Sequence, residues 1–218
     1  MTIDELLQSS IANRKSMNPF RILAKASRLW WREWIGMILL NILWLALQAP
    51  LVTGPPATAV LYAAARKVHN EEVWEMQDMW GDLRRLFWPA WRWALPNLLV
   101  VGALVWNFYA YQDAEGGIWL ALRLVWGLLL LLWLLLNLFY WPFWLAQSEK
   151  SLWTTYANCG RFLLLHPWSG LLLGGTAVLV WLLSLRFILP LSAGAVIWLA
   201  LVGETAVSQS LANKKCKA

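Results

Sequence analysis

The chain of 218 residues has room for one domain of ordinary size, but its composition is not that of a soluble protein. Hydrophobic residues make up 60% of it and charged residues 14%, whereas a soluble domain carries roughly 25% charged residues. The composition therefore excludes an ordinary water-soluble domain and predicts an integral membrane protein. The net charge of +6 does not indicate nucleic-acid binding, because no nucleic-acid-binding motif accompanies it.

Residues 1–33 are predicted to be an amphipathic, basic segment that lies in the membrane interface. Its second half carries Arg21, Lys25, Arg28 and Arg32, and tryptophans follow at the start of the first apolar run. Basic side chains beside tryptophan are typical of helices in the headgroup layer. The 19 tryptophans of the chain fit the same environment, because the indole ring has an apolar body and one N–H donor.

Residues 34–211 are predicted to form the transmembrane domain. The first span runs from Trp34 to Val52, close to the roughly 20 residues that a crossing needs. Proline cannot continue the helical hydrogen-bond ladder, so a proline-rich turn motif ends this span. The motif consists of Pro50, Thr53, Gly54, Pro55 and Pro56.

The second apolar segment, residues 57–65, is short for a crossing and leads directly into Arg66 and Lys67. It spans the bilayer if these two side chains snorkel to the interface. Alternatively, it is a re-entrant half-helix. The sequence is compatible with both the spanning helix and the half-helix.

Four further spans are predicted at residues 94–111, 118–141, 168–188 and 191–211. Pro142 and Pro190 are expected to end the second and third of these four. The intervening residues 69–93 and 146–166 have apolar side chains at helical spacing and charged ones opposite. These two segments are predicted to be amphipathic helices on the cytoplasmic surface.

The distribution of basic residues predicts the orientation. Nearly all of them lie in residues 1–33, in the 66–93 and 146–166 segments and in the tail 212–218, whereas the connections near 53–56 and 112–117 hold none and the turn between the fifth and sixth spans holds only Arg186. By the positive-inside rule, both termini are cytoplasmic. The predicted fold is an all-α bundle of about six spans in the cytoplasmic membrane, with its basic residues facing anionic headgroups.

Glu204 is the most informative single residue, because it lies inside the sixth predicted span. A carboxylate at the centre of the bilayer costs about 2.5–3.5 kcal/mol, and such residues often have a function. The alternative is structural, since Glu204 is close enough to the basic tail to reach headgroups or to pair with a basic side chain.

Amide side chains inside the spans are the other candidates. Asn41 and Gln48 lie on one face of the first span together with Trp44. This stripe either lines a solute path or bonds to a neighbouring helix, at about 0.6 kcal/mol per contact. Asn97 and Asn137 are the partners expected for such interhelical bonds.

Glycines in the last two spans predict close helix packing. Gly170, Gly174 and Gly175 lie in the fifth span, and Gly194 and Gly203 lie in the sixth. Small residues allow helices to approach closely, so these two helices are expected to pack tightly together or to form a dimer face.

No motif for nucleophilic catalysis, nucleotide binding or metal ligation is present in the sequence. His69 and His166 are the only histidines, and neither lies inside a predicted span. We therefore expect no enzyme activity, no cofactor and no metal.

One stretch of the chain carries a family resemblance. Residues 50–68 read PLVTGPPATAVLYAAARKV, a span that ends in a proline and threonine turn, followed by an alanine-rich helix with basic residues at its end. With the later stretches EVWEMQDMWGDLRRLFWPAW and YWPFWLAQSEKSLWTTYANCGRFLLLHPW, this order resembles the YesL-like family of bacterial membrane proteins over residues 30–211. Family members usually have a residue between the threonine and the glycine, whereas Gly54 follows Thr53 directly here.

The resemblance implies a small helical membrane protein that serves carbohydrate uptake. Together with the amphipathic segments, it favours an accessory or scaffold protein that binds a membrane complex. The expected partner is another membrane protein or a second copy of the chain. The alternative is a small transporter or channel, with Asn41, Gln48 and Glu204 facing its path.

Overall fold

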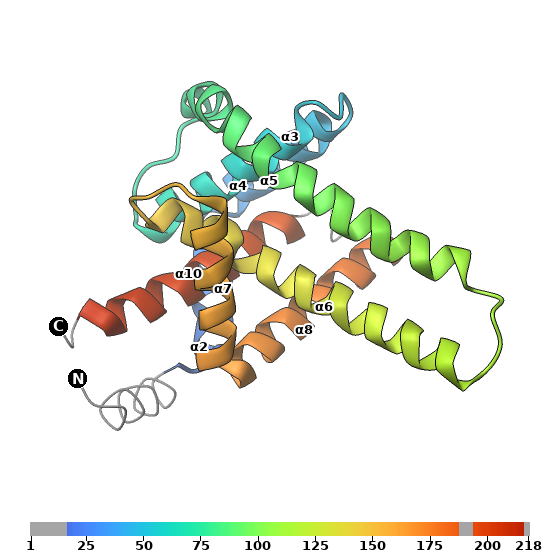
Figure 1. Cartoon of the computed structure of the whole chain (residues 1–218). Helices are drawn as coiled ribbons and strands as arrows, with labels where there is room; N and C mark the ends of the chain where they lie inside the picture. The colour runs from blue at the N-terminus through green and yellow to red at the C-terminus, as the bar shows by residue number, and fades with distance from the viewer. Residues whose placement is uncertain (1–16, 188–193, 216–218) are drawn as a thin grey trace.

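A computed structural model describes residues 17–187 and 194–215, and it is helical throughout this part of the chain, without strands. The all-α prediction is confirmed. The helices are α2 (Pro19–Arg32), α3 (Trp34–Gln48), α4 (Gly54–His69), α5 (Met76–Ala110), α6 (Gly117–Ala146), α7 (Leu152–Leu165), α8 (Pro167–Arg186) and α10 (Ala195–Lys215) (Figure 1).

Four helices of the described part are long and apolar enough to cross a membrane: α5, α6, α8 and α10. This supports a membrane-embedded protein and four of the six predicted spans. The first two predicted spans became α3 and α4, which have 15 and 16 residues. Both are shorter than the roughly 20 residues that a straight crossing needs.

Prolines inside helices changed two predicted boundaries. The 69–93 segment and the third span were expected to be separate, but α5 continues over 35 residues with Pro89 and Pro96 inside it. The expected end of a helix at Pro142 is wrong, because α6 continues to Ala146. A proline removes one backbone hydrogen bond, and in membrane helices neighbouring groups compensate for that loss. The predicted break at Pro190 lies outside the described residues.

The two short helices α2 and α7 are amphipathic, as predicted. On α2, Ile22, Ala26 and Leu29 form one buried face, and the basic side chains lie elsewhere on the helix. The helix begins where Asn18 Oδ1 accepts hydrogen bonds from the backbone N–H groups of Phe20 and Arg21. Such a helix presents its charges away from the molecule's interior.

On α7, Thr155, Cys159 and Phe162 form the buried face at the same helical spacing. Trp153 and Leu164 are exposed on the same helix. In Figure 1, α7 stands across the direction of α6, as a helix lying in the membrane surface would. The structure therefore supports the predicted amphipathic segment at 146–166.

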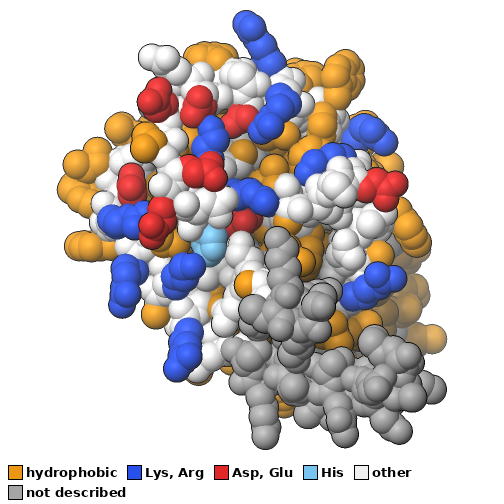
Figure 2. Space-filling view, turned by 90° about the vertical axis from the view of Figure 1, so that its left-hand side faces the viewer, with side chains coloured by type: hydrophobic (Ala, Val, Ile, Leu, Met, Phe, Trp, Pro, Cys, Tyr) orange, Lys and Arg blue, Asp and Glu red, His pale blue; other side chains and the backbone are white. Residues whose placement is uncertain are grey.

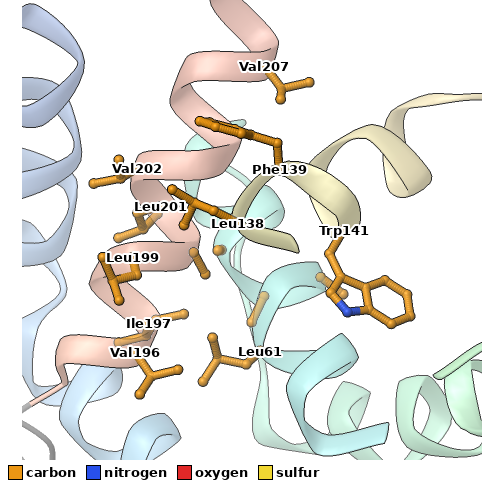
Figure 3. Packing of buried hydrophobic residues seen from close by; sticks show 14 of the residues in the cluster. Leu61, Leu138, Phe139, Trp141, Val196, Ile197, Leu199, Leu201, Val202 and Val207 are labelled. Atoms are coloured by element: carbon orange, nitrogen blue, oxygen red, sulfur yellow. The ribbon is translucent and has the colours of Figure 1, made fainter. Parts of the chain in front are cut away.

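The core is built around α10 and α4. Figure 3 shows side chains of α10 meeting Leu61 of α4 and Leu138 and Phe139 of α6 in one buried cluster. Trp141 belongs to the same cluster but points away from α10 (Figure 3). Lipid chains are as apolar as these side chains, so close packing stabilises this core more than exclusion of water does.

Four of the five predicted packing glycines lie at close contacts: Gly174 and Gly203 meet α6, Gly170 meets Leu163 of α7, and Gly194 meets Trp30 of α2. A Cβ at Gly203 of α10 would lie 2.8 Å from the carbonyl oxygen of Leu138. A Cβ at Gly174 of α8 would lie 1.6 Å from Leu135 Cδ2. The expectation that these glycines pack the last two helices on each other is therefore corrected: Gly174 and Gly203 bring α8 and α10 against α6.

Helices α5 and α6 form a hairpin that extends beyond the ends of the other helices (Figure 1). Aromatic rings gather near its tip, where Tyr111 stacks on Trp119 with ring centroids 4.8 Å apart. A second group of rings surrounds Trp141 near the base, where Trp144 lies 5.3 Å from it. Along α6, Trp119 and Trp141 are separated by about 33 Å at 1.5 Å per residue. This matches a hydrocarbon layer of about 30 Å between two aromatic belts.

The opposite end of the molecule is charged. Figure 2 shows lysine, arginine, aspartate and glutamate side chains spread over this end, around a histidine. Several of them form ion pairs, such as Lys67 Nζ with Asp78 Oδ2 at 2.8 Å and Arg85 Nη2 with Asp82 Oδ1 at 2.7 Å. At the hairpin tip, by contrast, Arg123 donates a hydrogen bond to the carbonyl oxygen of Ala114. The charged end is therefore where the described part of the chain meets water most extensively.

Candidate functional site

The hairpin is joined at its base by a reciprocal set of hydrogen bonds. Helices α5 and α6 each carry a tryptophan followed four residues later by an asparagine, so that both side chains share one face. Trp93 Nε1 donates to Asn137 Oδ1 at 2.9 Å. Trp133 Nε1 donates to Asn97 Oδ1 at 2.8 Å. Because the helices are antiparallel, each tryptophan reaches the asparagine of the other helix.

The asparagine amides are held in place by their own helices. Asn97 Nδ2 donates to the carbonyl oxygen of Trp93 at 2.7 Å, and Asn137 Nδ2 donates to that of Trp133 at 2.8 Å. Each Oδ1 atom is thereby directed toward the indole N–H that crosses from the other helix. Buried polar groups of this kind contribute stability only when their partners are correctly placed.

Tyr156 of α7 completes the set. Its hydroxyl accepts from Asn97 Nδ2 at 3.0 Å and donates to Asn137 Oδ1 at 3.1 Å. Its ring stacks on Trp133, with centroids 5.2 Å apart. Burial raises the pKa of Tyr156 to about 12, so the hydroxyl keeps its proton at neutral pH. We call Trp93, Asn97, Trp133, Asn137 and Tyr156 the Trp–Asn clasp.

The clasp changes the interpretation of two predicted residues. Asn97 and Asn137 were expected to bond to the first-span stripe, but their side-chain hydrogen bonds join α5, α6 and α7. Asn41 of that stripe is fully buried in α3. Trp93 and Trp133 were not predicted as partners, although the Trp-x-x-x-Asn pattern occurs once on each helix.

The rest of the stripe connects α3 to α4. Trp44 Nε1 donates to Thr58 Oγ1 at 3.0 Å, and Gln48 Nε2 donates to the carbonyl oxygen of Gly54 at 3.4 Å. Thr53 Oγ1 closes the turn by donating to the carbonyl oxygen of Leu47 at 2.6 Å. These side chains bond to neighbouring backbone and hydroxyl groups, as expected for the structural alternative.

The turn motif matches its predicted role. Helix α3 ends at Gln48, before Pro50, and α4 begins at Gly54 with Pro55 and Pro56 in its first turn. Proline suits that position, because the first N–H groups of a helix have no intrahelical acceptor. A Cβ at Gly54 would lie 2.7 Å from Gln48 Oε1, so this close approach requires glycine or a shift of the glutamine.

Glu204 lies on α10 and is 2% exposed. Ser208 Oγ donates to its Oε1 atom at 3.2 Å. The Oε2 atom is buried and has no hydrogen-bond partner within residues 17–187 and 194–215. Arg66 of α4 is the basic residue whose charge acts on this carboxyl group, but no ion pair joins the two in the described residues.

His69 ends α4 close to Glu204's helix, with its Nδ1 atom 3.3 Å from Thr205 Oγ1. Burial, followed by the charges of Lys25 and Arg66, lowers the pKa of His69 to about 4. The imidazole is therefore neutral at physiological pH. Its surroundings are electropositive, which makes this end of α4 more suited to an anion than to a metal cation.

A cavity of about 450 Å³ opens at the charged end, lined in part by residues of α4. Its basic lining residues are Arg66, Lys67, Arg85 and Lys150, and its acidic ones are Glu72 and Asp82. The charged lining residues come from α4, from the connection after it, from α5 and from the segment after α6, so no single sequence motif indicated them. The helical spacing of Asp78, Asp82 and Arg85 was the one local signal.

Metal and thiol chemistry find no support in these residues. Within the described residues, no group of three or more histidine, cysteine, aspartate or glutamate side chains is placed to hold a metal ion. Cys159 is free and fully buried, and burial raises the pKa of its thiol well above the usual range. A thiol in this state is a poor nucleophile.

Comparison of the chain with protein-family models, with curated protein sequences and with solved structures gave no match. The resemblance to the YesL-like family therefore stays a prediction from the motifs at residues 50–68 and the two later stretches.

Proposed function

We propose that the chain is an accessory protein of the membrane, and that its α5–α6 hairpin docks against the spanning helices of another membrane protein. The observation that carries the proposal is the exposure of the hairpin. Only 6% of the most apolar stretch of α6 is buried inside the molecule, although α6 is the most hydrophobic of the candidate spans. Leu124 and Leu128 are 62% and 66% exposed.

The clasp at the base of the hairpin adds a second reason. Lipid covers an apolar hairpin equally well whatever the orientation of the hairpin relative to the other helices. A hairpin that contacts only lipid therefore has little need of a fixed orientation. The Trp–Asn clasp joins α5, α6 and α7 to one another through four interhelical hydrogen bonds, at distances of 2.8–3.1 Å. A fixed direction suits a surface that must meet a partner of defined shape.

We further propose that the protein lies in the cytoplasmic membrane with both termini on the cytoplasmic side. The basic residues outside the spans favour this orientation. Four crossings satisfy it if α3 and α4 form a re-entrant pair, and six satisfy it if both cross. The resemblance to the YesL-like family favours a carbohydrate-uptake complex as the partner.

Affinity purification from native membranes tests the docking proposal. We expect a protein partner to be retained at constant stoichiometry by the wild type. Leu128→Trp, which changes the shape of the hairpin but keeps it apolar, should lose that partner. Leu171→Trp on α8 is the matched control, because Leu171 is 54% exposed on a different helix. If neither the wild type nor the control retains a protein, the accessory role is wrong.

A small transporter is the second candidate, and Glu204 favours it. A buried carboxyl group with one oxygen that lacks a hydrogen bond within the described residues is a feature of ion-coupled sites. Glu204→Gln should then abolish uptake into vesicles without changing the amount of folded protein. Equal uptake by the variant and the wild type would exclude this role.

A further inference from the structure

We infer that the cavity at the charged end of the molecule binds a phosphate-bearing ligand, with Arg66 as its central contact. The inference does not depend on the proposed docking of the hairpin, because it concerns a different surface. It rests on the cavity, on the pairing of its charged residues and on the state of Arg66.

Three of the four basic side chains already have partners. Lys67 pairs with Asp78 at 2.8 Å, and Arg85 pairs with Asp82 at 2.7 Å. Lys150 Nζ donates to the carbonyl oxygens of Trp144 and Gln147, both at 2.7 Å, and so caps the end of α6. These contacts hold the three cations around the cavity.

Arg66 differs from these three residues. It forms no ion pair with any described acidic side chain, and its Nη1 atom is buried without a hydrogen-bond partner in residues 17–187 and 194–215. A buried guanidinium N–H without an acceptor is unfavourable, so the Arg66 side chain is incompletely satisfied by the described protein groups. Arg66 is only partly buried and lines the cavity, so a ligand there would bring acceptor oxygens to the accessible edge of its guanidinium group.

The charges that line the cavity favour the binding of an anion. The cavity is lined by four basic and two acidic side chains. Burial, and after it the positive charges of Arg66 and Arg85, lower the pKa of Lys150, so these three basic groups lie close enough to repel one another. One of the two carboxyl groups, Glu72, is turned to Asn70, whose Nδ2 atom donates to its Oε1 atom at 3.3 Å.

The volume of the cavity indicates an anion larger than chloride or a single carboxylate. About 450 Å³ is far more than a chloride ion or a single carboxylate needs. A phosphate group offers several acceptor oxygens and fits the planar fork of an arginine in a bidentate manner. Apolar side chains, among them Leu86 and Trp144, line the cavity too, so the rest of the ligand has an apolar surface to contact. The phosphate comes either from a lipid headgroup of the inner leaflet or from a soluble phosphorylated compound.

Thermal unfolding of the full chain in an uncharged maltoside detergent distinguishes these sources. The probes are short-chain phosphatidylglycerol and inorganic phosphate, each compared with sodium chloride at the same ionic strength. A ligand that binds only the folded state raises the unfolding temperature with concentration. Stabilisation by the lipid alone indicates a headgroup site, and stabilisation by inorganic phosphate indicates a site for soluble phosphates. If neither probe stabilises the wild type, the inference is overturned.

Three variants locate the binding. Arg66→Gln should weaken binding by roughly 10- to 100-fold, the effect of losing a charge-assisted hydrogen-bond donor. Arg84→Gln is the matched control and should bind like the wild type, because Arg84 is exposed and does not line the cavity. Glu72→Gln should bind about threefold more tightly, because it removes a repelling charge from an exposed position.

Glu72→Gln keeps the inference testable even if Arg66→Gln does not fold. Equal affinity in the wild type and Glu72→Gln, or unchanged affinity in a folded Arg66→Gln protein, would show that the cavity is not the site.

Discussion

At the scale of single residues, the molecule depends on polar side chains whose hydrogen bonds are made inside an apolar environment. Asn97 and Asn137 use both atoms of their amide groups, so that neither the N–H₂ group nor the oxygen is left without a partner. Glu204 differs, because only one of its two oxygens has a hydrogen-bond donor in the described part of the chain. This contrast separates residues that hold the fold together from a residue available for a further role.

Replacing Asn137 by leucine tests the clasp. The variant removes the acceptor for Trp93 and Tyr156, and it should lower the free energy of unfolding by about 1–2 kcal/mol, given membrane hydrogen bonds of up to about 1.7 kcal/mol. Unfolding in mixed detergent micelles measures this loss. Asn107→Leu on α5 is the control and should change stability much less, since the Asn107 side chain makes no hydrogen bond within the described residues. Equal losses in the two variants would contradict the assigned role of the clasp.

His69 makes a prediction about pH. The folded protein lowers the pKa of His69 to about 4 from an ordinary value of 6.5. Between these two values the unfolded chain binds a proton that the folded chain does not, so stability falls as the pH drops from 6.5 to 4. His69→Gln should remove this part of the pH dependence, which unfolding at a series of pH values measures. A wild-type and a variant curve of the same slope over this range would show that His69 is not responsible.

At the scale of the helices, close approach to α6 organises the core. Gly203 lets α10 contact the backbone of α6 at Leu138, and Gly174 lets α8 contact Leu135. At Gly203 the nearest neighbour is a backbone atom, which cannot move aside as a side chain can. The contact between α10 and α6 therefore depends on the lack of a side chain at this position.

Gly203→Ala should lower the free energy of unfolding by about 1–3 kcal/mol, the usual cost of overpacking a core. Gly175→Ala on α8 is the matched control, because a Cβ there would meet nothing within 4 Å. We expect the control to be neutral or to gain up to about 1 kcal/mol from the better helix propensity of alanine. Thermal unfolding of the two proteins side by side gives the comparison. A stable Gly203→Ala protein would mean that α10 and α6 are not in close contact.

Some features of the helices could be predicted from the sequence, and others could not. Basic residues beside tryptophans predicted the interfacial segment that contains α2, periodic apolar residues predicted α7, and proline and glycine predicted the turn between α3 and α4. These features depend on local chemistry. The continuation of α6 past Pro142 was not predictable in this way, because it depends on what surrounds the proline after folding. The partners of Asn97 and Asn137 depend on the register of two antiparallel helices, which the spacing within one helix does not define.

At the scale of the whole molecule, the chain divides into a charged end and an apolar hairpin (Figures 1 and 2). The charged end holds the cavity with Arg66, and the hairpin carries exposed leucines between two groups of aromatic rings. Composition alone predicted a membrane protein, but the cavity joins residues of α4, α5 and the region around the end of α6, and it could not be assembled from the sequence. The hairpin is the feature on which the accessory role depends.

Site-specific photo-crosslinking in native membranes tests that role most directly. A photoreactive amino acid replaces Leu128 on the hairpin in one protein and Leu171 on α8 in the other, both of which are exposed positions. The account predicts that Leu128 yields an adduct with one defined membrane protein and that Leu171 yields lipid adducts or none. Lipid adducts alone at Leu128 would contradict the proposal that the hairpin docks against a partner.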